Sequence, residues 1–587
     1  MKRFRWVVFL ALAVTAGCGG DDPLTGPGGL TLTFTPGTLD LGTTRSATIQ
    51  IANTGSSDLG PIELTGGQIA GPGGLPITGS QLASTPSQFP VLRAGATADV
   101  SVGVTLPNDI ESGSYQANLT ARVGDQTAAV LIVDLSVAVV SPFFGTVTIT
   151  GGPTSIRQGA IETYTAEVRD STGQVTTAET VTWSVVPFSA GLADAAGRIV
   201  GYAPGAASVV ASVGGVTDEL EVTVVARGAP SGSLISIGEG SITDRFTSDL
   251  WVHGNVAYTG TWGCRDASGN QCGNNGLLGN TLYVWDVSVP AAPALADSVQ
   301  VDARTLNDVK ISADGTLGVV THQGSSDMMT GMTLLDLADP LHPAVISTLA
   351  DSDFGLGVHN AWIDGNYVYL VLNGSSAASG LKVVDIKTPA APTIVASFYG
   401  GSSLLHDVYV RDGLAFLSHW DAGLIILDVG NGIADGSPTN PAEVGRIDIP
   451  GFFVHNAWYW PAAGYVFLGD EVGVPGVMRV IDVRDPTAPV EVASLSIDGA
   501  TPHNFWIDES RGIGYFAWYE NGIQAVDVSG DLMGQLELQG RHIAELQFGS
   551  GGCIGTGLTC TWAPQLHNGN VYISEMNTGL RVLSPTF

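Results

Sequence analysis

The sequence is poor in positive charge. Of its 587 residues only 23 are Lys or Arg, against 55 Asp or Glu, and the formal net charge is -32. Proteins that bind nucleic acid hold the phosphate backbone with clustered Lys and Arg, so this composition argues against a nucleic-acid partner. An acidic surface of this kind favours solubility.

Long apolar runs are also missing. After the N-terminus no segment reaches the roughly 20 residues that a transmembrane helix needs. The one run near the start, Trp6 to Ala16, follows three cationic residues and is too short to span a bilayer as a mature helix. We interpret this run as an export signal.

The end of that run carries a motif. Residues Thr15 to Cys18 read Thr-Ala-Gly-Cys and resemble the lipobox of bacterial lipoproteins. The resemblance implies a signal peptide over residues 1–17, acylation of Cys18 and a membrane contact through that lipid, followed by a flexible tether over 18–29. Gly19, rather than Asp, suits sorting to the outer membrane or cell surface. Leu is usual where Thr15 stands, so ordinary signal cleavage is the alternative.

Catalytic motifs are absent as well. The sequence has no Gly-x-Ser-x-Gly elbow, no His-Glu-x-x-His and no phosphate-binding glycine loop followed by Lys. Nothing in it therefore supports an enzyme, and we expect a protein that binds rather than catalyses.

Cysteine is scarce, with five residues in all. Beyond Cys18 the others form two close pairs, Cys264 with Cys272 and Cys553 with Cys560. An exported protein meets an oxidising environment, so we predict two disulfides, formed either within each pair or between the two pairs. A site of four metal-bound thiolates is the alternative, although neither pair has the tight spacing of zinc knuckles.

Glycine and proline are plentiful, with 78 and 30 residues. Together with many Val, Thr and Ile residues they favour short strands joined by turns, and the length requires several cores. We predict an all-β chain. Residues 30–140 alternate apolar and polar positions, as in Ser46 to Ala52 and Ala128 to Asp134, and predict a β-sandwich. This segment resembles immunoglobulin-like modules of bacterial surface proteins.

Residues 141–228 carry more specific marks. They include Val181-Thr-Trp-Ser184, Gly197-Arg-Ile-Val-Gly201 and Leu220-Glu-Val-Thr-Val224. The segment resembles the bacterial Ig-like group 2 family, which implies a second immunoglobulin-like sandwich that serves as a stalk. Within it we expect Trp183 to fill the core from a central strand and the glycines to occupy turns.

From residue 229 to 587 one pattern recurs at a period of about 50 residues, the spacing of four-stranded propeller blades. Six of the units contain a strand that ends in Asp, at Asp286, Asp336, Asp385, Asp428, Asp482 and Asp527. These strands resemble the LVIVD repeat, which implies a β-propeller. Seven unit starts predict seven blades, and the strand at Leu234 to Gly238 is expected to complete the sheet of the last unit.

The repeated Asp residues have two interpretations. They could bind calcium, or each could cap its turn by accepting a hydrogen bond from its own downstream backbone. A turn follows each of them, usually with Pro, so we expect turn capping.

A polar pair opens the first strand of most units, and these strands converge on a central channel. The candidate ligand or metal residues at the channel mouth are His359, His406, His455, His503, Asn360, Asp407, Asn456, Asn504 and Asp308. Neutral imidazoles bind zinc, copper or nickel, with Asp308 and Asp407 as orienting carboxylates. Alternatively, one copy in each blade fastens neighbouring blades by hydrogen bonds. We expect the remaining histidines to be mostly solvated.

These patterns predict an exported, lipid-anchored surface protein without enzymatic activity, in which two sandwich domains carry a seven-bladed propeller. Its partner would be an extracellular protein or glycan, bound on the face that bears the polar pairs and both cysteine pairs. Trp420, Trp460 and Trp518 would add contact surface there or, alternatively, pack in the core. The competing hypothesis is a periplasmic or extracellular metalloprotein, with or without enzymatic activity, that binds a transition metal through the four histidines; no other cofactor is expected.

Overall fold

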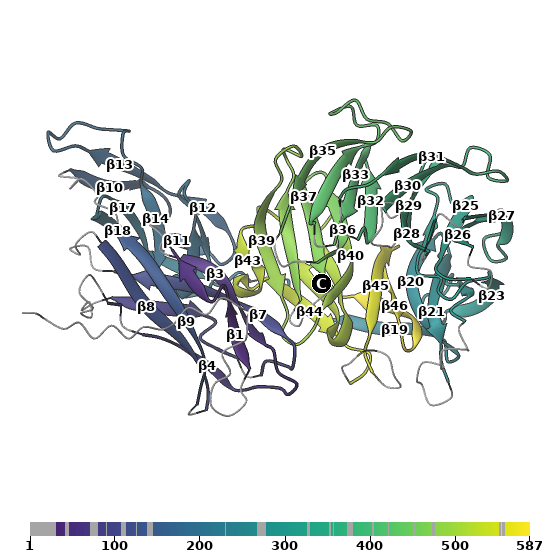
Figure 1. The fold of residues 1–587 in the computed structure, drawn as a ribbon, viewed down its shortest axis with the longest axis horizontal. Coiled ribbons are helices and arrows are strands. Elements are labelled where there is room, and N and C mark those ends of the chain that lie inside the picture. Colours follow the sequence, from purple (N-terminus) through teal and green to yellow (C-terminus); the bar gives the residue numbers. More distant parts are fainter. Residues whose placement is uncertain are drawn as a thin grey trace, which may run out of the picture. The chain divides into compact units, whose positions relative to one another are not determined.

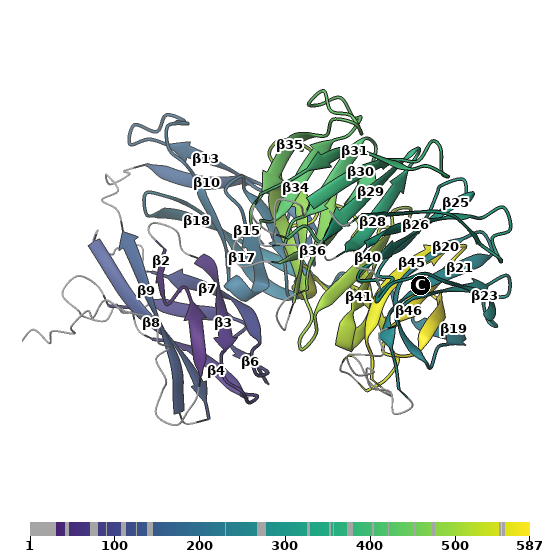
Figure 2. The ribbon, with the colours of Figure 1, turned by 45° about the vertical axis from the view of Figure 1, so that its right-hand side comes forward.

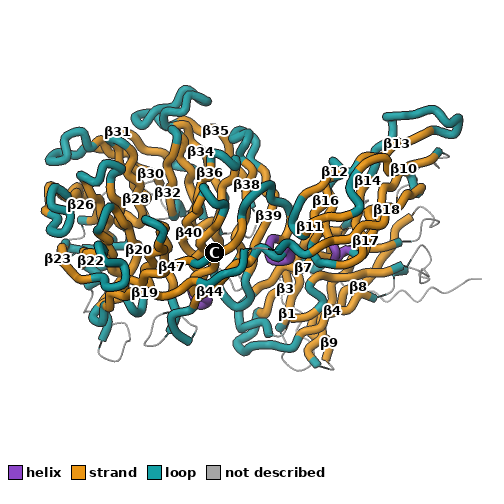
Figure 3. Tube along the Cα trace, turned by 180° about the vertical axis from the view of Figure 1, so that it is seen from behind, coloured by secondary structure: helices purple, strands orange, loops and turns teal. Residues whose placement is uncertain are grey.

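The computed structural model describes residues 31–41, 46–67, 69–70, 80–89, 91–106, 113–124, 126–137, 145–228, 230–266, 278–325, 329–351, 354–355, 357–372, 380–401, 404–420, 422–449, 453–471, 476–550, 553 and 558–587. The predicted signal peptide, the tether with Cys18, and Cys272 lie outside these ranges. Strands dominate the described residues (Figure 3), and helix occurs there only as short 3-10 turns, which include η1 (Phe188–Ala190), η3 (Tyr519–Asn521) and η4 (Leu536–Gln539). None of the described helices is long and apolar enough to cross a membrane.

The first compact unit ends at Val137 and contains two sheets. One has the order β1 (Leu32–Thr35), β3 (Ser46–Asn53), β7 (Thr97–Thr105), β5 (Gln81–Thr85). The other has the order β2 (Thr38–Asp40), β9 (Gln126–Val137), β8 (Gly113–Val123), β4 (Ile62–Gly66), β6 (Gln88–Phe89). Alternate residues such as Ile49, Ile51, Val100 and Leu131 are buried, as a half-buried sheet requires. The alternation predicted from the sequence is confirmed; its assignment to the immunoglobulin type stays a prediction.

The second compact unit begins, among the described residues, with three sheets over 145–228. Their orders are β11 (Ser155–Arg157), β18 (Val216–Val225), β17 (Gly205–Val213), β14 (Thr182–Val186), then β12 (Ile161–Thr163), β16 (Arg198–Gly201), β15 (Gly191–Ala193), and the pair β10 (Thr146–Gly151) with β13 (Thr165–Arg169). Trp183 lies on β14, an edge strand, and is only half-buried, so its expected central position was wrong. Gly197 has φ +77°, as its turn requires.

The rest of the unit is a succession of sheets built mostly from strands consecutive in the sequence (Figures 1 and 2). Their strands are β20 (Arg245–His253), β21 (Val256–Cys264), β22 (Thr281–Asp286), β23 (Ala294–Gln300); β24 (Val309–Ile311), β25 (Leu317–His322), β26 (Thr330–Asp336), β27 (Ala344–Asp351); β28 (Val358–Asp364), β29 (Tyr367–Leu372), β30 (Gly380–Asp385), β31 (Thr393–Phe398); β32 (Asp407–Arg411), β33 (Leu414–Ser418), β34 (Leu424–Asp428), β35 (Ala442–Ile447); β36 (Val454–Trp460), β37 (Tyr465–Asp470), β38 (Val477–Asp482), β39 (Val490–Ser496), joined at its edge by β43 (Gly534–Gln535); β40 (Pro502–Asp508), β41 (Ile513–Trp518), β42 (Gly522–Asp527), β44 (His542–Leu546); and β45 (Thr561–His567), β46 (Asn570–Glu575), β47 (Gly579–Pro585).

The first strands of these sheets contact one another in sequence order, and β45 of the last sheet contacts β20 of the first. The last sheet takes its fourth strand from β19 (Leu234–Ser241), which pairs antiparallel with β47. This pairing was predicted from the sequence. It joins the two ends of the repeat region and covers an edge that would otherwise expose unpaired backbone groups.

The repeated Asp residues cap turns. In each of the six units with an Asp-ended strand, Oδ1 accepts a hydrogen bond from the backbone N–H two residues later, at 2.8 to 3.0 Å; the residues are Asp286, Asp336, Asp385, Asp428, Asp482 and Asp527. Capping, rather than calcium binding, therefore accounts for the repetition.

Residues 145–228 make polar contacts with the repeats inside the second unit. Arg227 forms a buried ion pair with Asp527 at 2.6 Å, and Arg541 donates to the carbonyl of Gly159 at 2.8 Å. Gln158 donates to the carbonyl of Leu538 at 2.9 Å. The segment predicted to be a stalk is thus fastened to the repeats through buried charges.

Candidate functional site

The first strand of each sheet supplies the central channel with residues at three levels. The polar pair predicted from the sequence gives the first two levels, and the residue two positions after the pair gives the third. In β28, for example, these residues are His359, Asn360 and Trp362. Because side chains alternate along a strand, the second and third levels share one face.

The first level faces the channel because several of these strands are irregular. The pairing register shifts between Val358 and Asn360 in β28 and between Val454 and Asn456 in β36, so the intervening His359 and His455 are bulged. A bulge lets two successive side chains point the same way and re-aims them at the rim of a sheet. His406 needs no bulge, because it lies one residue before β32.

The four predicted histidines form one continuous row of rings. Centroids are 4.4 Å apart between His359 and His406, 4.4 Å between His406 and His455, and 4.1 Å between His455 and His503. Trp562 continues the row 4.4 Å from His503. The structure therefore brings together all four histidines, as the sequence predicted.

Backbone carbonyls orient two of these rings. His406 Nδ1 donates to the carbonyl of His455 at 3.1 Å, and His503 Nδ1 donates to the carbonyl of Trp562 at 2.6 Å. Each bond joins neighbouring sheets, which is the fastening role considered for these residues. It also leaves the Nε2 atom of the neutral ring with a lone pair, ready to accept or to ligate.

Burial keeps the histidines neutral. Desolvation lowers the pKa of His455 to about 3 and lowers the pKa of His359, His406 and His503 well below the usual value, and the neighbouring imidazoles add to the effect. A neutral imidazole is the form that binds metals and polar ligands.

Glu471 meets two of the rings. Its Oε2 lies 3.5 Å from His406 Nε2 and 3.7 Å from His455 Nε2, and the ligand atoms of the three residues all lie within 4.8 Å of one another. Tyr519 donates to the other carboxylate oxygen, Oε1, at 2.9 Å. Burial raises the pKa of Glu471, while the hydroxyl of Tyr519 acts in the opposite direction.

The second level is a buried polar layer. Asn307 donates to Asn360 at 2.9 Å, and Asn360 donates to Asp407 at 2.7 Å. Lys310 forms ion pairs with Asp249, at 2.7 Å, and with Asp308. Burial raises the pKa of Asp308 well above its usual value, although Lys310 opposes this.

This layer corrects one prediction. Asp308 accepts from Lys310 and from the backbone of Ala361, while Asp407 accepts from Asn360 and from the backbone of Val408. Neither carboxylate hydrogen bonds to a histidine, because each lies one residue further along the strand and one level deeper. Backbone carbonyls orient His406 and His503 instead.

Asn456 and Asn504, the other predicted polar residues, also lie in this layer. Asn504 donates to Asp249 at 3.3 Å. Asn456 is buried, and its Oδ1 has no hydrogen-bond partner among the described residues.

The third level is a closed ring of five aromatic side chains. Successive centroids are 4.5 to 6.2 Å apart around the cycle, and Lys310 Nζ lies 5.3 Å from the centroid of Trp251; the five are Trp251, Trp362, Tyr409, Trp458 and Trp506. The cavity among these rings holds only about 60 Å³. We missed this ring in the sequence, although an aromatic residue three positions after the start of the polar pair in five units was a visible signal.

The histidine row lines a larger pocket of about 270 Å³. Besides the histidines and Glu471, its wall includes Tyr519, Trp262, Trp562 and Met576, together with Asn307, Asn360 and Asn504. A mostly apolar wall with a few convergent polar atoms is typical of small-ligand sites.

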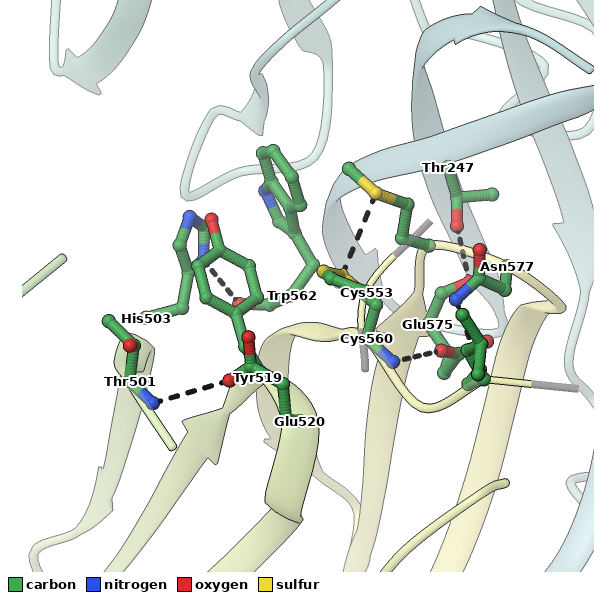
Figure 4. Close-up of a disulfide and its surroundings, with 12 residues drawn as sticks. Thr247, Thr501, His503, Tyr519, Glu520, Cys553, Cys560, Trp562, Glu575 and Asn577 are labelled. Carbon is green, nitrogen blue, oxygen red and sulfur yellow. Dashed lines mark hydrogen bonds between the residues drawn. A yellow bond between two sulfur atoms is a disulfide. The ribbon is translucent and has the colours of Figure 1, made fainter. Parts of the chain in front are cut away.

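Figure 4 shows the wall beside the predicted disulfide Cys553–Cys560, which is present. His503, Tyr519 and Trp562 gather next to it, and Cys553 lines the pocket. The disulfide therefore borders the pocket, as expected from the sequence. Cys264 ends β21, and Cys272, the other cysteine of its close pair, lies outside the described residues.

Some surface predictions fail. His322 and His419 are 2% and 1% exposed, not solvated, because each lies at the end of the second strand of its sheet, which has a paired strand on either side. Trp518 and Trp460 pack in the core, the alternative considered for them. Trp420 is half-buried and stacks on His406 with centroids 4.8 Å apart.

Sequence reasoning missed Glu471 and Tyr519. Each follows the second strand of its sheet. Because the first two strands pair antiparallel, the end of the second strand lies beside the start of the first: Asp470 pairs with Val454, and Trp518 pairs with Pro502. The residue after the second strand is thus placed beside the polar pair, a rule that could have found both.

Comparison with known proteins agrees with the repeat. The LVIVD repeat family matches residues 357–399 and 405–449, which contain β28–β31 and β32–β35, so the chain carries LVIVD repeats. The chain is also similar to the solved C-terminal WD40 domain of Sif2, with 12% identity and a TM-score of 0.38 over 75% of this chain and 98% of that domain. No curated protein matches the chain. Nothing about function is taken from a structural likeness of that size.

Proposed function

We propose that this chain is an exported, lipid-anchored surface protein whose seven-bladed β-propeller binds an extracellular protein or glycan without enzymatic activity. The pocket of about 270 Å³ at the mouth of the central channel is the observation that carries the proposal. Side chains from consecutive sheets converge there, and four neutral histidines line it, of which His406 and His503 are oriented by backbone carbonyls.

The blade count rests on the strand contacts. Seven first strands contact one another in a cycle, and β19 supplies the outer strand of the last sheet. Shared construction of that sheet from both ends of the repeat region is the usual means of closing a propeller.

The chemistry of the wall favours a neutral polar ligand group. Indole and phenol rings of Trp562 and Tyr519 offer flat apolar faces, whereas imidazoles and amides offer hydrogen bonds. The volume admits one sugar ring or one protruding side chain, so a terminal sugar or a side chain of a protein partner fits it.

A binding experiment tests this function. The mature chain with Cys18→Ser, which remains in solution, is applied to immobilised glycans and cell-surface proteins. Trp562→Ala and His503→Ala should weaken binding at least about tenfold, because both remove pocket wall, whereas exposed His542→Ala should not. Binding that persists in both pocket variants would place the contact elsewhere and contradict the proposal.

The anchor has its own test. Cells grown with a radiolabelled fatty acid should label the wild-type protein but not Cys18→Ser, and only the wild type should remain in the membrane fraction. Equal labelling of the two proteins would contradict acylation at Cys18.

A second candidate function is metal binding, favoured by one specific observation. His406, His455 and Glu471 place three potential ligand atoms within 4.8 Å of one another.

A further inference from the structure

We infer that the pocket holds one divalent transition-metal ion, bound by His406 Nε2, His455 Nε2 and Glu471 Oε2, with a coordination position open to the ligand. This inference rests on the proposed function in one respect only, since it takes the same pocket as the binding site. It assigns to Glu471 a role that the sequence did not suggest.

Two hydrogen-bond acceptors, His406 Nε2 and Glu471 Oε2, lie next to each other in the pocket. His406 Nδ1 faces the carbonyl of His455 at 3.1 Å and must carry the proton of the neutral ring. Nε2 is then a bare lone pair, yet it points at the carboxylate oxygen of Glu471 at 3.5 Å. Two lone pairs that face each other in a buried site repel unless a proton or a metal ion lies between them, and 3.5 Å is longer than the about 2.7–3.2 Å of an ordinary hydrogen bond.

The distances between the three candidate ligand atoms also fit a bound metal ion. Two ligand atoms bound to one zinc ion at about 2.1 Å and a tetrahedral angle lie about 3.4 Å apart. The two Nε2-to-Oε2 distances, 3.5 and 3.7 Å, are close to this value. Small rotations of the side chains would bring all three atoms into coordination, because Glu471 stands on a loop after β37 rather than inside a strand.

Further hydrogen bonds orient two of the candidate metal ligands, His406 and Glu471. His406 is held by a backbone carbonyl, and Glu471 Oε1 accepts a hydrogen bond from Tyr519 at 2.9 Å, which turns Oε2 toward the histidines. Metal ligands in proteins are commonly oriented in this way. We assign Tyr519 as a positioning residue.

The pocket provides the room and the neutral surroundings that such a site requires. His406 and His455 are 6% and 2% exposed, and His455 Nδ1 is buried without a partner in the described part of the chain. Glu471 is a quarter exposed and borders the open space of the pocket. Two imidazoles and one carboxylate favour Zn²⁺, Cu²⁺, Ni²⁺ or Fe²⁺ over Ca²⁺ and Mg²⁺.

The open position gives the ion a function in recognition. Three protein ligands leave a tetrahedral ion with one site for water or an incoming oxygen atom. A carboxylate or a pair of hydroxyls on a glycan or protein would bind there, while Trp562 and Tyr519 contact the rest of the ligand.

The experiment uses the full mature chain, purified without an affinity column that carries metal and then treated with a chelator. Titration with ZnCl₂ and CoCl₂ should give one ion per chain, and bound Co²⁺ should show the visible absorption of a low-coordinate site. CaCl₂ and MgCl₂ should not compete. A folded protein that binds neither Zn²⁺ nor Co²⁺ at near unit ratio would overturn the inference.

Variants locate the site. His406→Ala, His455→Ala and Glu471→Gln should each lower Zn²⁺ affinity at least about a hundredfold, and Tyr519→Phe about tenfold with the stoichiometry kept and the Co²⁺ spectrum shifted. His542 and Glu545 form an exposed pair at 3.8 Å, so His542→Ala is the matched control and should bind normally. Circular dichroism checks that each variant folds. Glu471→Gln keeps the size of the side chain, so it tests the site even if an alanine variant fails to fold.

Other outcomes are informative in opposite directions. Loss of Zn²⁺ binding in His359→Ala and His503→Ala, with normal binding in His406→Ala and His455→Ala, would overturn the proposed ligand set. Ligand binding that survives removal of metal, yet fails in Trp562→Ala, would leave the proposed function standing and refute the metal inference.

Discussion

At the scale of single residues, the centre of the repeat region depends on buried polar groups that satisfy one another. Lys310 is 8% exposed and forms ion pairs with both Asp249 and Asp308. Burying a charge is costly unless a partner and hydrogen bonds compensate for it. The polar layer thus carries its own compensation, which also explains why most units repeat a polar pair.

Lys310→Ala should lower the free energy of unfolding by about 3–5 kcal/mol, because it leaves Asp249 buried without its cation. Lys387→Ala, which removes an exposed pair with Asp385, should leave the free energy of unfolding almost unchanged, because water and salt screen the pair. Urea unfolding followed by tryptophan fluorescence compares them. Equal stability of the two variants would contradict this view of the layer.

At the scale of elements, strands and their turns determine which side chains reach the channel. Asp428, at the end of β34, accepts hydrogen bonds from five backbone N–H groups, those of Gly430, Asn431, Gly432, Ala434 and Gly436. Burial opposes its ionisation, but these donors outweigh burial and lower its pKa. One carboxylate thereby orders a whole turn.

Asp428→Asn should lower the free energy of unfolding by about 2 kcal/mol or more, since an amide cannot accept all five bonds. The pKa of Asp428 is depressed in the folded protein, so its contribution is present above the unfolded-state pKa and is lost as pH falls through the folded-state pKa. Stability curves of wild type and variant should therefore converge at acidic pH. A constant difference down to low pH would disagree with this.

The aromatic ring gives a second test at this scale. Trp458 contacts both Tyr409 and Trp506, with centroids 5.2 and 4.7 Å apart, and is 9% exposed. Trp458→Ala should cost about 3–5 kcal/mol. Thermal unfolding measures this loss of stability. Trp183→Ala, which removes a half-buried side chain in residues 145–228, serves as the comparison and should lower the stability less.

Much of the arrangement of elements follows from the sequence. The unit starts, the Asp-capped turns, the pairing of β19 with β47 and the gathering of four histidines were all predicted from the repeat. The bulges at His359 and His455 were not, because a register shift leaves no mark in residue type. Glu471 escaped because the residue type after the second strand differs from unit to unit, as the equivalent Tyr519 shows, and Trp183 because a large aromatic residue does not reveal whether its strand is central.

At the scale of the whole molecule, the described residues from 145 onward belong to one compact unit. Arg227 and Asp527 form one of the buried contacts between its two parts, with side chains 6% and 10% exposed. Asp527 also caps its turn through Ser529, so the same carboxylate serves the local turn and the long-range contact.

Arg227→Ala should uncouple the two parts, because Asp527 loses its cation in a buried place. Calorimetry of the mature chain should show residues 145–587 unfolding together in the wild type and in two transitions in the variant. Arg446→Ala removes an exposed pair with Glu443 and should leave the profile unchanged. A single transition in Arg227→Ala would mean that other contacts suffice.

The central claim is that the channel mouth is a binding site with a metal ion at its centre. The most direct measurement is a crystal structure of the mature protein grown with ZnCl₂, with anomalous diffraction recorded above and below the zinc edge. We expect one strong peak about 2.0–2.2 Å from His406 Nε2, His455 Nε2 and Glu471 Oε2, and a light-atom ligand at the fourth position. A map with no peak in the pocket, and with Glu471 turned away from both rings, would contradict the claim.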